Sequence, residues 1–178
     1  EMFNRLTFEH FQAMNLLSQE AQYSPLTNPT GIVLGEGIGC VALSTQPNPQ
    51  LPCEIVGVTT LTDNENLTNS SESALRNLIN ACLNNANFTP ADIDGVKVHG
   101  VGGNSDEMEL RVLQEIFPHA QWLSIKTQTG HTLGASGALE SAILFNRLKS
   151  EPQKCGRFLN YFLGFGGSNI AWVLEVNK

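Results

Sequence analysis

The sequence has no long hydrophobic run and no excess of positive charge. None of its apolar stretches reaches the ~18 residues that a membrane-spanning helix needs, so we expect no membrane span. Lysine and arginine together number 10 against 17 aspartates and glutamates, which gives a formal net charge of −7. Because nucleic acids are bound by basic surfaces, we also expect no nucleic-acid partner.

Cysteine is scarce and scattered, with four residues and no C-x-x-C pair: Cys40, Cys53, Cys82 and Cys155. This spacing fits neither a disulfide framework nor a zinc site, so we expect no metal site. The glycine clusters match no phosphate-binding motif, which argues against a nucleotide cofactor. Reduced thiols, and a first segment without the layout of a signal peptide, predict a cytoplasmic protein.

The 178 residues are 41% hydrophobic, which is enough for one domain with a core. From residue 54 onward, segments rich in β-branched residues alternate with segments of helical periodicity. This alternation predicts an α/β fold with a partly parallel sheet. The expected strands are residues 54–61, 95–98, 122–125, 158–162 and 170–176, and the expected helices are residues 70–85, 106–117 and 134–149.

The first 50 residues have a different pattern. Apolar side chains at helical spacing predict a helix over residues 3–17 with one apolar face. That face would consist of Phe3, Leu6, Phe8, Phe11, Met14 and Leu17. The glycines of residues 31–44 predict a tight hairpin, and the proline-rich residues 46–50 predict a turn. We therefore expect two parts, residues 1–46 and residues 54–178.

Two histidines follow predicted strands. His99 comes directly after the strand at residues 95–98, and His131 comes after a polar turn that contains Lys126. Ligand sites of α/β sheets lie at the carboxyl ends of the strands, so both imidazoles are candidate site residues. His131 also precedes a helix of small residues, where the positive end of the helix dipole would favour a developing negative charge.

Four motifs, in this order and spacing, resemble those of the β-ketoacyl-acyl carrier protein synthases. They are Gly31–Gly39, Val98–Gly103, Lys126–Glu140 and Leu163–Asn169. The resemblance covers nearly the whole chain and implies an α/β, thiolase-like layered fold. This chain would supply the C-terminal half of that fold, at residues 54–178, plus a remnant of the N-terminal half at residues 1–46.

The resemblance also implies roles for five residues. His99 and His131 would donate hydrogen bonds to a thioester oxygen as an enolate forms, and Lys126 would hold the electrostatics of the site. Glu140 would be the structural partner of Lys126, and Phe165 would gate the site from a glycine-rich loop. Without the flanking motifs, the two histidines would be taken as structural, Lys126 as solvated and Phe165 as core. His10 and His119 match no motif and are expected at the surface.

Two departures from the family pattern separate two hypotheses. None of the cysteines stands in the context of the family's nucleophile, which is expected before residue 1. Val101 and Gly103 occupy positions where the family carries threonines that bind the phosphopantetheine arm. These departures favour a chain-length-factor-like subunit that pairs with a catalytic ketosynthase and shapes the acyl tunnel. The retained His99, Lys126 and His131 favour the alternative, the C-terminal part of an active synthase.

Both hypotheses imply protein partners. The incomplete fold predicts an apolar face covered by a catalytic ketosynthase or by an N-terminal fragment of the same protein. An acyl carrier protein would deliver the acyl-phosphopantetheine, and no cofactor resident in this chain is expected.

Overall fold

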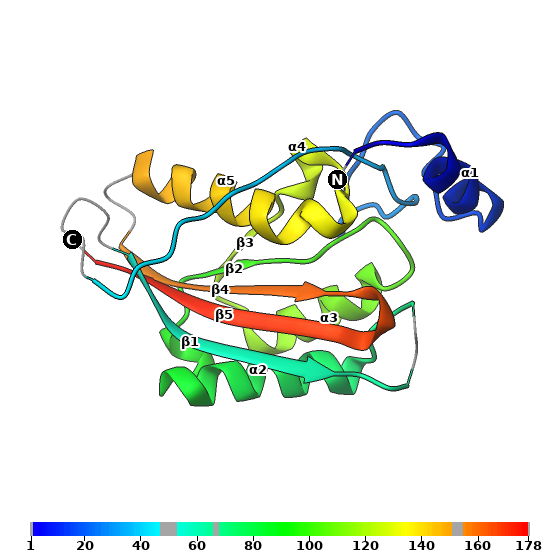
Figure 1. The fold of residues 1–178 in the computed structure, drawn as a ribbon. Coiled ribbons are helices and arrows are strands. Elements are labelled where there is room, and N and C mark those ends of the chain that lie inside the picture. The colour runs from blue at the N-terminus through cyan, green and yellow to red at the C-terminus, as the bar shows by residue number, and fades with distance from the viewer. Residues whose placement is uncertain (1, 47–52, 66–67, 151–154, 178) are drawn as a thin grey trace.

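The fold centres on one mixed five-stranded sheet in the order β1-β5-β4-β2-β3. The computed structural model describes residues 2–46, 53–65, 68–150 and 155–177 (Figure 1). β2 pairs in parallel with both β3 and β4, while β5 runs antiparallel to β1 and β4. This confirms the predicted α/β class with a partly parallel sheet. The strands are β1 Cys53–Thr62, β2 Gly95–Lys97, β3 Gln121–Leu123, β4 Gly156–Leu163 and β5 Ser168–Val176.

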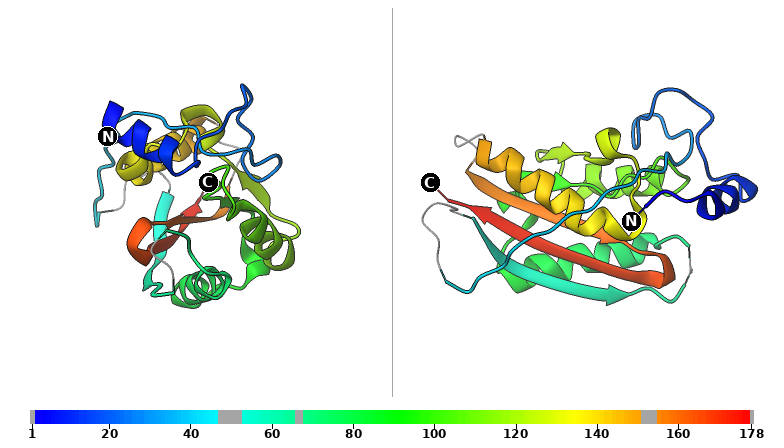
Figure 2. Two further views of the ribbon diagram at one scale, coloured as in Figure 1. Left: turned by 90° about the vertical axis from the view of Figure 1, so that its right-hand side faces the viewer. Right: turned by 45° about the horizontal axis from the view of Figure 1, so that its top comes forward.

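Helices cover both faces of the sheet. α2 and α3 lie on one face and α5 lies on the other, as Figures 1 and 2 show. α1 lies beyond the end of the sheet, at the side from which α5 starts. The helices are α1 Arg5–Ala13, α2 Glu72–Ala86, α3 Asp106–Ile116, α4 Lys126–Thr129 and α5 Ser136–Ser150, with short 3-10 turns η1 Pro90–Asp92, η2 Leu133–Ala135 and η3 Phe165–Gly167.

Residues at its two ends determine where α2 begins and ends. The Ser71 side chain accepts a hydrogen bond from the Ala74 amide and so caps the first turn. Asn87 adopts a left-handed conformation and ends the helix. Between these caps, apolar residues at helical spacing are buried, as predicted. The helix predicted at residues 70–85 is therefore confirmed to within two residues at each end.

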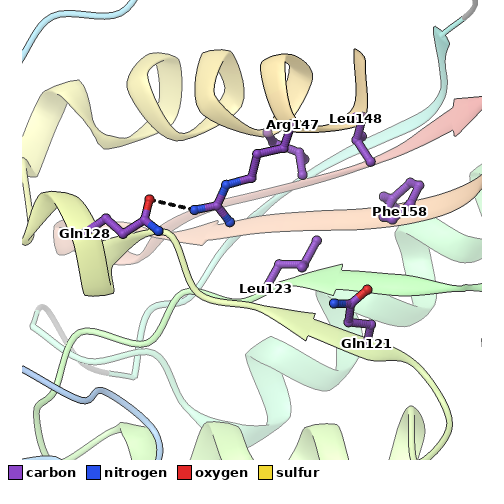
Figure 3. Close-up of a pocket in the computed structure, with 7 residues that line it drawn as sticks. Gln121, Leu123, Gln128, Arg147, Leu148 and Phe158 are labelled. Carbon is purple, nitrogen blue, oxygen red and sulfur yellow. Dashed lines mark hydrogen bonds between the residues drawn. The ribbon is translucent and has the colours of Figure 1, made fainter. Parts of the chain in front are cut away.

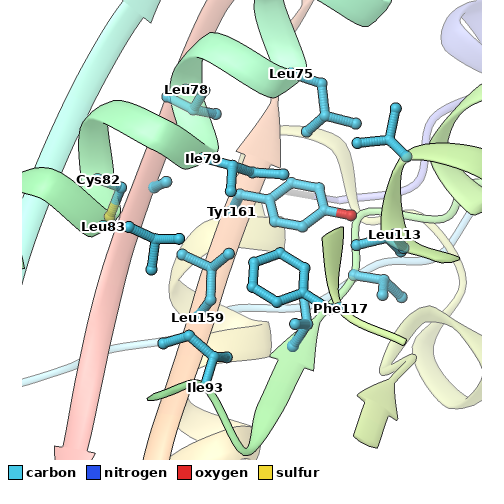
Figure 4. Packing of buried hydrophobic residues seen from close by; sticks show 14 of the residues in the cluster. Leu75, Leu78, Ile79, Cys82, Leu83, Ile93, Leu113, Phe117, Leu159 and Tyr161 are labelled. Atoms are coloured by element: carbon cyan, nitrogen blue, oxygen red, sulfur yellow. The ribbon is translucent and has the colours of Figure 1, made fainter. Parts of the chain in front are cut away.

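The main core lies between the sheet and the α2–α3 layer. It is apolar and closely packed around Phe117 and Tyr161 (Figure 4). Each fully buried large side chain there contributes roughly 1.5–3 kcal/mol of transfer free energy. A smaller cluster joins α5 to the opposite face of the sheet. It consists of Ile125, Leu144, Leu148, Phe158 and Leu174.

The hairpin predicted at residues 31–44 is wrong. The segment is extended and passes along α5 (Figure 1), and its only described bridges join Ile32 to Leu17 and Leu34 to His131. Gly35, Gly37 and Gly39 do not have the positive φ of a tight turn. A Cβ at Gly39 would overlap the backbone nitrogen of Leu139, so the glycine allows close approach to α5.

The predicted N-terminal helix is shorter than expected. α1 covers Arg5–Ala13, and only Phe11 on it is buried. Phe3, Leu6, Phe8 and Met14 of the predicted face are exposed, whereas Leu17 is half-buried against the Phe11 cluster. The turn predicted at residues 46–50 falls almost wholly outside the described residues.

Candidate active site

The site is assembled at the carboxyl edge of the parallel strands. β2 leads into His99, β3 leads into α4, and β4 leads into the glycine-rich turn η3. The extended N-terminal segment completes the assembly, because the His131 amide donates to the Val33 carbonyl at 2.7 Å. The Gly35 amide in turn donates to the His131 carbonyl at 3.0 Å. Segments far apart in the sequence thus fix His131 in place.

The structure brings the two candidate histidines together. The ring centroids of His99 and His131 lie 6.0 Å apart, with an interplanar angle of 85°. Both side chains are buried, with exposures of 9% and 7%. His10 and His119 are exposed, as predicted.

Hydrogen bonds set the tautomer of each ring. His99 Nδ1 accepts from the Leu163 amide at 3.5 Å. His131 Nδ1 accepts from the Leu133 amide at 3.4 Å and lies 3.3 Å from Ser136 Oγ. A ring nitrogen that accepts a hydrogen bond carries no proton, so in the neutral rings the proton is on Nε2. Each histidine can therefore donate from Nε2.

Burial keeps both imidazoles neutral. Desolvation, reinforced by the charge of Lys126, lowers the pKa of His99 well below its usual value. Desolvation first, and then Lys126, lowers the pKa of His131 to about 4. Near neutral pH, the pair consists of two uncharged N–H donors.

Lys126 and Glu140 form a buried ion pair behind the histidines. Lys126 Nζ lies 2.7 Å from Glu140 Oε1, and both side chains are 1% exposed. The predicted partnership of these residues is therefore present, and Lys126 is buried in α4 instead of solvated in a turn. Lys97 Nζ binds the second oxygen, Glu140 Oε2, at 3.0 Å. Desolvation opposes ionisation of Glu140, while the two lysines lower its pKa overall.

Two further buried carboxylates clamp the loop that carries His99. Glu109 accepts from the amides of His99 and Gly100, at 2.7 and 2.8 Å, and from the Tyr161 hydroxyl. Asp106 accepts from the amides of Val101 and Gly102, both at 3.0 Å. Desolvation raises the pKa of both carboxyl groups against these hydrogen bonds. The loop is thus held by α3, so His99 sits on a fixed support.

The loop after β4 is anchored at its base and open at its tip. Asn169 Oδ1 accepts from the Gly164 amide at 3.2 Å and from Ser70 Oγ at 2.9 Å. Phe165 is 55% exposed, and its ring centroid lies 6.4 Å from that of Phe11 on α1. The following Gly166 has φ 76°, with no atom near its missing Cβ. Phe165 therefore lies outside the core, on an exposed tip.

Neither Cys53 nor Cys82 has an activated thiol. Cys82 lies on α2, beneath the opposite face of the sheet, and burial raises its pKa to about 11. Burial also raises the pKa of Cys53. A nucleophilic cysteine needs the reverse shift, so neither residue is suited to that role.

A cavity lies away from the histidines. It has a volume of about 320 Å³ and is formed beside β3, between α4 and the second half of α5 (Figure 3). Arg147 extends from α5 toward α4 and donates to Gln128 Oε1 at 2.7 Å (Figure 3). The floor is apolar, formed by Leu123, Leu144, Leu148 and Phe158.

The parts of the chain that the structure describes contain no cluster of three potential metal ligands and no helix long and apolar enough to cross a membrane.

Known protein families and proteins are similar in sequence to this chain. Residues 52–152 match the family described as the C-terminal domain of β-ketoacyl synthases. The chain belongs to the β-ketoacyl synthase family. Among curated relatives, Nodulation protein E of Rhizobium sp. (strain N33) is 30% identical over 140 residues, covering 73% of this chain and 35% of the relative. The 3-oxoacyl-[acyl-carrier-protein] synthase 2 of Coxiella burnetii is 32% identical over 125 residues, covering 64% and 30%.

A solved structure extends the likeness to the whole fold. A chain of the complex between the ketosynthase ApeO and its chain length factor ApeC, from Xenorhabdus doucetiae, matches with a TM-score of 0.81 and 22% identity. The match covers 99% of this chain and 51% of that chain. The predicted thiolase-like fold is thereby confirmed. The chain spans about a third of the length of the curated relatives and half of the solved chain.

The sequence analysis did not identify Lys97, Glu109 and Asp106 as residues of the site. Lys97 reads as one polar residue in a short strand, and its partner Glu140 lies 43 residues away. Glu109 and Asp106 stand in the first turn of α3, where acidic residues are common because they complement the helix dipole. The one sequence feature that sets Lys97 apart is its position between Val96 and Val98, since side chains alternate between the two faces of a strand.

Proposed function

We propose that this chain forms the C-terminal half of a β-ketoacyl synthase that condenses acyl thioesters in fatty acid or polyketide biosynthesis. The observation that carries the proposal is the pair of buried, neutral imidazoles, His99 and His131, with ring centroids 6.0 Å apart. Two neighbouring rings that can each donate from Nε2 suit a single oxygen on which negative charge develops. A donor placed in this way is worth roughly 3 kcal/mol of barrier.

In the proposed reaction, a malonyl thioester loses carbon dioxide. The bond between the carboxylate and the α-carbon breaks, and its electrons form an enolate whose oxygen accepts hydrogen bonds from His99 and His131. The enolate carbon then attacks an acyl thioester held on a cysteine, and the cysteine leaves as a thiolate. The two histidines need no change of protonation state for this step, which agrees with their lowered pKa values.

The remaining predicted residues support the pair. Lys126 would fix the electrostatics of the site and Glu140 would hold Lys126, as their 2.7 Å ion pair suggests. Phe165 would gate access, because it is exposed on the glycine-rich tip next to the site. The nucleophilic cysteine would come from polypeptide outside these 178 residues. An acyl carrier protein would bring the acyl-phosphopantetheine, and the cytoplasm is the proposed location.

One observation favours a second candidate, a chain-length-factor-like subunit that assembles with a catalytic ketosynthase. Val101 stands where the family places a threonine, and its side chain packs with Phe11 and Ile32 in a buried cluster. The second such position, Gly103, has no side chain. A chain that never handles the phosphopantetheine arm would have no need of these hydroxyls.

The two candidates are separated by a decarboxylation assay on the full native polypeptide that contains this chain. Release of carbon dioxide from a malonyl thioester is measured for the wild type, for His99→Ala and for His131→Ala. His10→Ala and His119→Ala are the matched controls, because both residues are exposed. The synthase proposal predicts a loss of about 10²–10³-fold for each site variant and no loss for either control.

A folded wild-type polypeptide without decarboxylation would overturn the synthase proposal. If that protein also co-purifies with a second ketosynthase, and the activity of this partner requires it, the chain-length-factor candidate is supported instead. The intact mass of the native polypeptide and of its partner distinguishes the two assemblies.

A further inference from the structure

Two buried hydroxyl groups lie behind His131, and the proposed function does not use them. Ser136 begins α5 and Thr132 directly precedes η2, and the two residues are 4% and 0% exposed. Ser136 Oγ lies 3.3 Å from His131 Nδ1 and 3.2 Å from Thr132 Oγ1. A chain of two hydroxyl groups therefore leads from Thr132 through Ser136 to the ring.

The Leu133 amide fixes the direction of this chain. It donates to His131 Nδ1 at 3.4 Å, so this ring nitrogen carries no proton in the neutral ring. Ser136 is then the donor toward Nδ1, and this contact uses the single proton of its hydroxyl. The contact between the two hydroxyls is therefore a hydrogen bond from Thr132 to Ser136. Hydrogen bonds in such a chain polarise and strengthen one another in a buried site.

Nδ1 of His131 shares its lone pair between two donors. The amide at 3.4 Å and the hydroxyl at 3.3 Å are both farther from it than the ~2.9–3.0 Å of an ordinary hydrogen bond, as in a three-centre arrangement. Since neither donor makes a short hydrogen bond, the hydroxyl adds to the support that the amide gives. His99 has a different support, because its Nδ1 accepts from the Leu163 amide at 3.5 Å.

We propose that Ser136 and Thr132 are positioning residues for His131, whose hydroxyl chain holds the ring with its proton on Nε2. Ser136 acts on the ring directly, and Thr132 acts through Ser136. The other tautomer would set a proton on Nδ1 against the Leu133 amide and would leave Nε2 without a hydrogen to donate. The value of this arrangement to the reaction rests on the function proposed above, in which His131 donates from Nε2.

The test observes the ring and not the reaction. The full native polypeptide is labelled with nitrogen-15 in its histidines. NMR above neutral pH, where burial keeps the ring uncharged, identifies the ring nitrogen that carries the proton. Ser136→Ala removes the hydroxyl donor, and alanine is well suited to a helix. Ser141→Ala is the matched control, because Ser141 is also buried on α5 but donates to the Gly137 carbonyl.

We expect His131 of the wild type to carry its proton on Nε2. In Ser136→Ala, the Nδ1 resonance should move toward that of a ring nitrogen without a hydrogen bond. The ratio of the Nε2–H to the Nδ1–H tautomer should fall about five-fold, as for the loss of one ordinary hydrogen bond. Ser141→Ala should change neither quantity, and His10 and His119 are exposed internal references.

Substitutions of Thr132 test the second link of the chain. Valine has the shape of threonine without the hydroxyl, so Thr132→Val should move the His131 Nδ1 resonance in the same direction as Ser136→Ala, by a smaller amount. Thr132→Ser keeps the hydroxyl and should retain the wild-type resonance. Because Thr132 acts through Ser136, adding Thr132→Val to Ser136→Ala should have no further effect on the ring.

A folded Ser136→Ala protein with an unchanged His131 Nδ1 resonance overturns the proposal, because the Leu133 amide alone would then hold the ring. A wild-type His131 with its proton on Nδ1 overturns it as well. A further shift in the double variant would reject the action of Thr132 through Ser136. A failed decarboxylation assay, together with the expected change in the ring, would reject the proposed function alone.

Discussion

The two faces of the sheet differ in the side chains that they bury, and residues 96–98 show the difference between apolar and charged side chains. Val96 and Val98 belong to the apolar core under α2 and α3. Lys97, between them, binds Glu140 on α5. Since successive side chains of a strand point to opposite faces, one short segment serves both. The α2–α3 face carries most of the apolar core, although Asp106 and Glu109 of α3 also hold the His99 loop. The α5 face combines a smaller apolar cluster with the buried lysine–glutamate group.

Buried charge on the α5 face makes that face the more fragile one. Its ion pairs are stable only as a complete set, because removing one partner leaves a charge without compensation. The apolar face tolerates changes that preserve volume, because its contacts are not directional. The following predictions test this difference, from the largest expected effect to the smallest.

Glu140→Gln should produce the largest loss of stability, because it leaves two buried lysines without a counter-charge. We expect the free energy of unfolding to fall by about 3–5 kcal/mol in urea denaturation. Glu9→Gln is the control, since the Arg5–Glu9 pair is exposed and should contribute less than about 1 kcal/mol. Equal effects of the two substitutions would remove the distinction between buried and exposed pairs.

Leu78→Ala tests the apolar face. Leu78 is fully buried in the core beneath α2, so the substitution leaves a cavity and should cost about 2–5 kcal/mol. Leu43→Ala, at a side chain 77% exposed, should change stability by less than about 0.5 kcal/mol. Leu78→Ala should leave the pH dependence of stability unchanged. A change in pH dependence would mean that the two faces are coupled.

His131 predicts a pH dependence specific to the α5 face. Its pKa is about 4 in the folded protein and ordinarily about 6.5, so the unfolded chain binds more protons between these values. Stability is therefore full above pH ~6.5 and decreases by roughly 2–3 kcal/mol as the pH falls to ~4. Urea titrations at several pH values should show a shallower decrease for His131→Gln. The same slope in both proteins would disagree with a buried neutral ring.

A pair of glycine substitutions should give the smallest effects, of opposite sign. Gly137 lies in α5 with no atom within 4 Å of its missing Cβ, so Gly137→Ala should stabilise residues 1–178 expressed alone by about 0.5–1 kcal/mol. Gly39→Ala should destabilise the same chain by about 1–3 kcal/mol, because the new methyl group would meet the backbone of Leu139. Thermal unfolding measures both, and effects of the same sign would be inconsistent with the close packing of residues 31–44 on α5.

Helices and strands whose bounds depend on residues within the same segment were predicted well. β1, α2, α3 and the paired strands β4 and β5 begin and end close to their predicted bounds, because hydrophobic periodicity, a Ser71 cap and an Asn87 stop act within one segment. The predictions failed where contacts between residues far apart in the sequence determine the structure. Gly35, Gly37 and Gly39 were interpreted as turn residues, but they allow close contacts with α4 and α5. The apolar spacing of residues 3–17 was interpreted as one helix, but α1 ends at Ala13 and Leu17 instead forms a bridge with Ile32.

The residues of the candidate site also fall into two groups, those with a recognisable sequence signal and those without one. His99, Lys126, His131 and Glu140 stand in recognisable motifs, and the structure places all four together. Lys97 has no such signal. A lysine in a strand is ordinarily solvated, and only the packing of α5 against β2 reveals that it is buried with Glu140.

The measurement that tests the central claim most directly is a double-mutant cycle on malonyl-thioester decarboxylation by the full native polypeptide. His99→Ala and His131→Ala should each lower the rate by about 10²–10³-fold. The double variant should lose much less than the product of the two, because both donors act on one oxygen. Full activity in either single variant, or independent effects that multiply, would contradict a shared site for the two imidazoles.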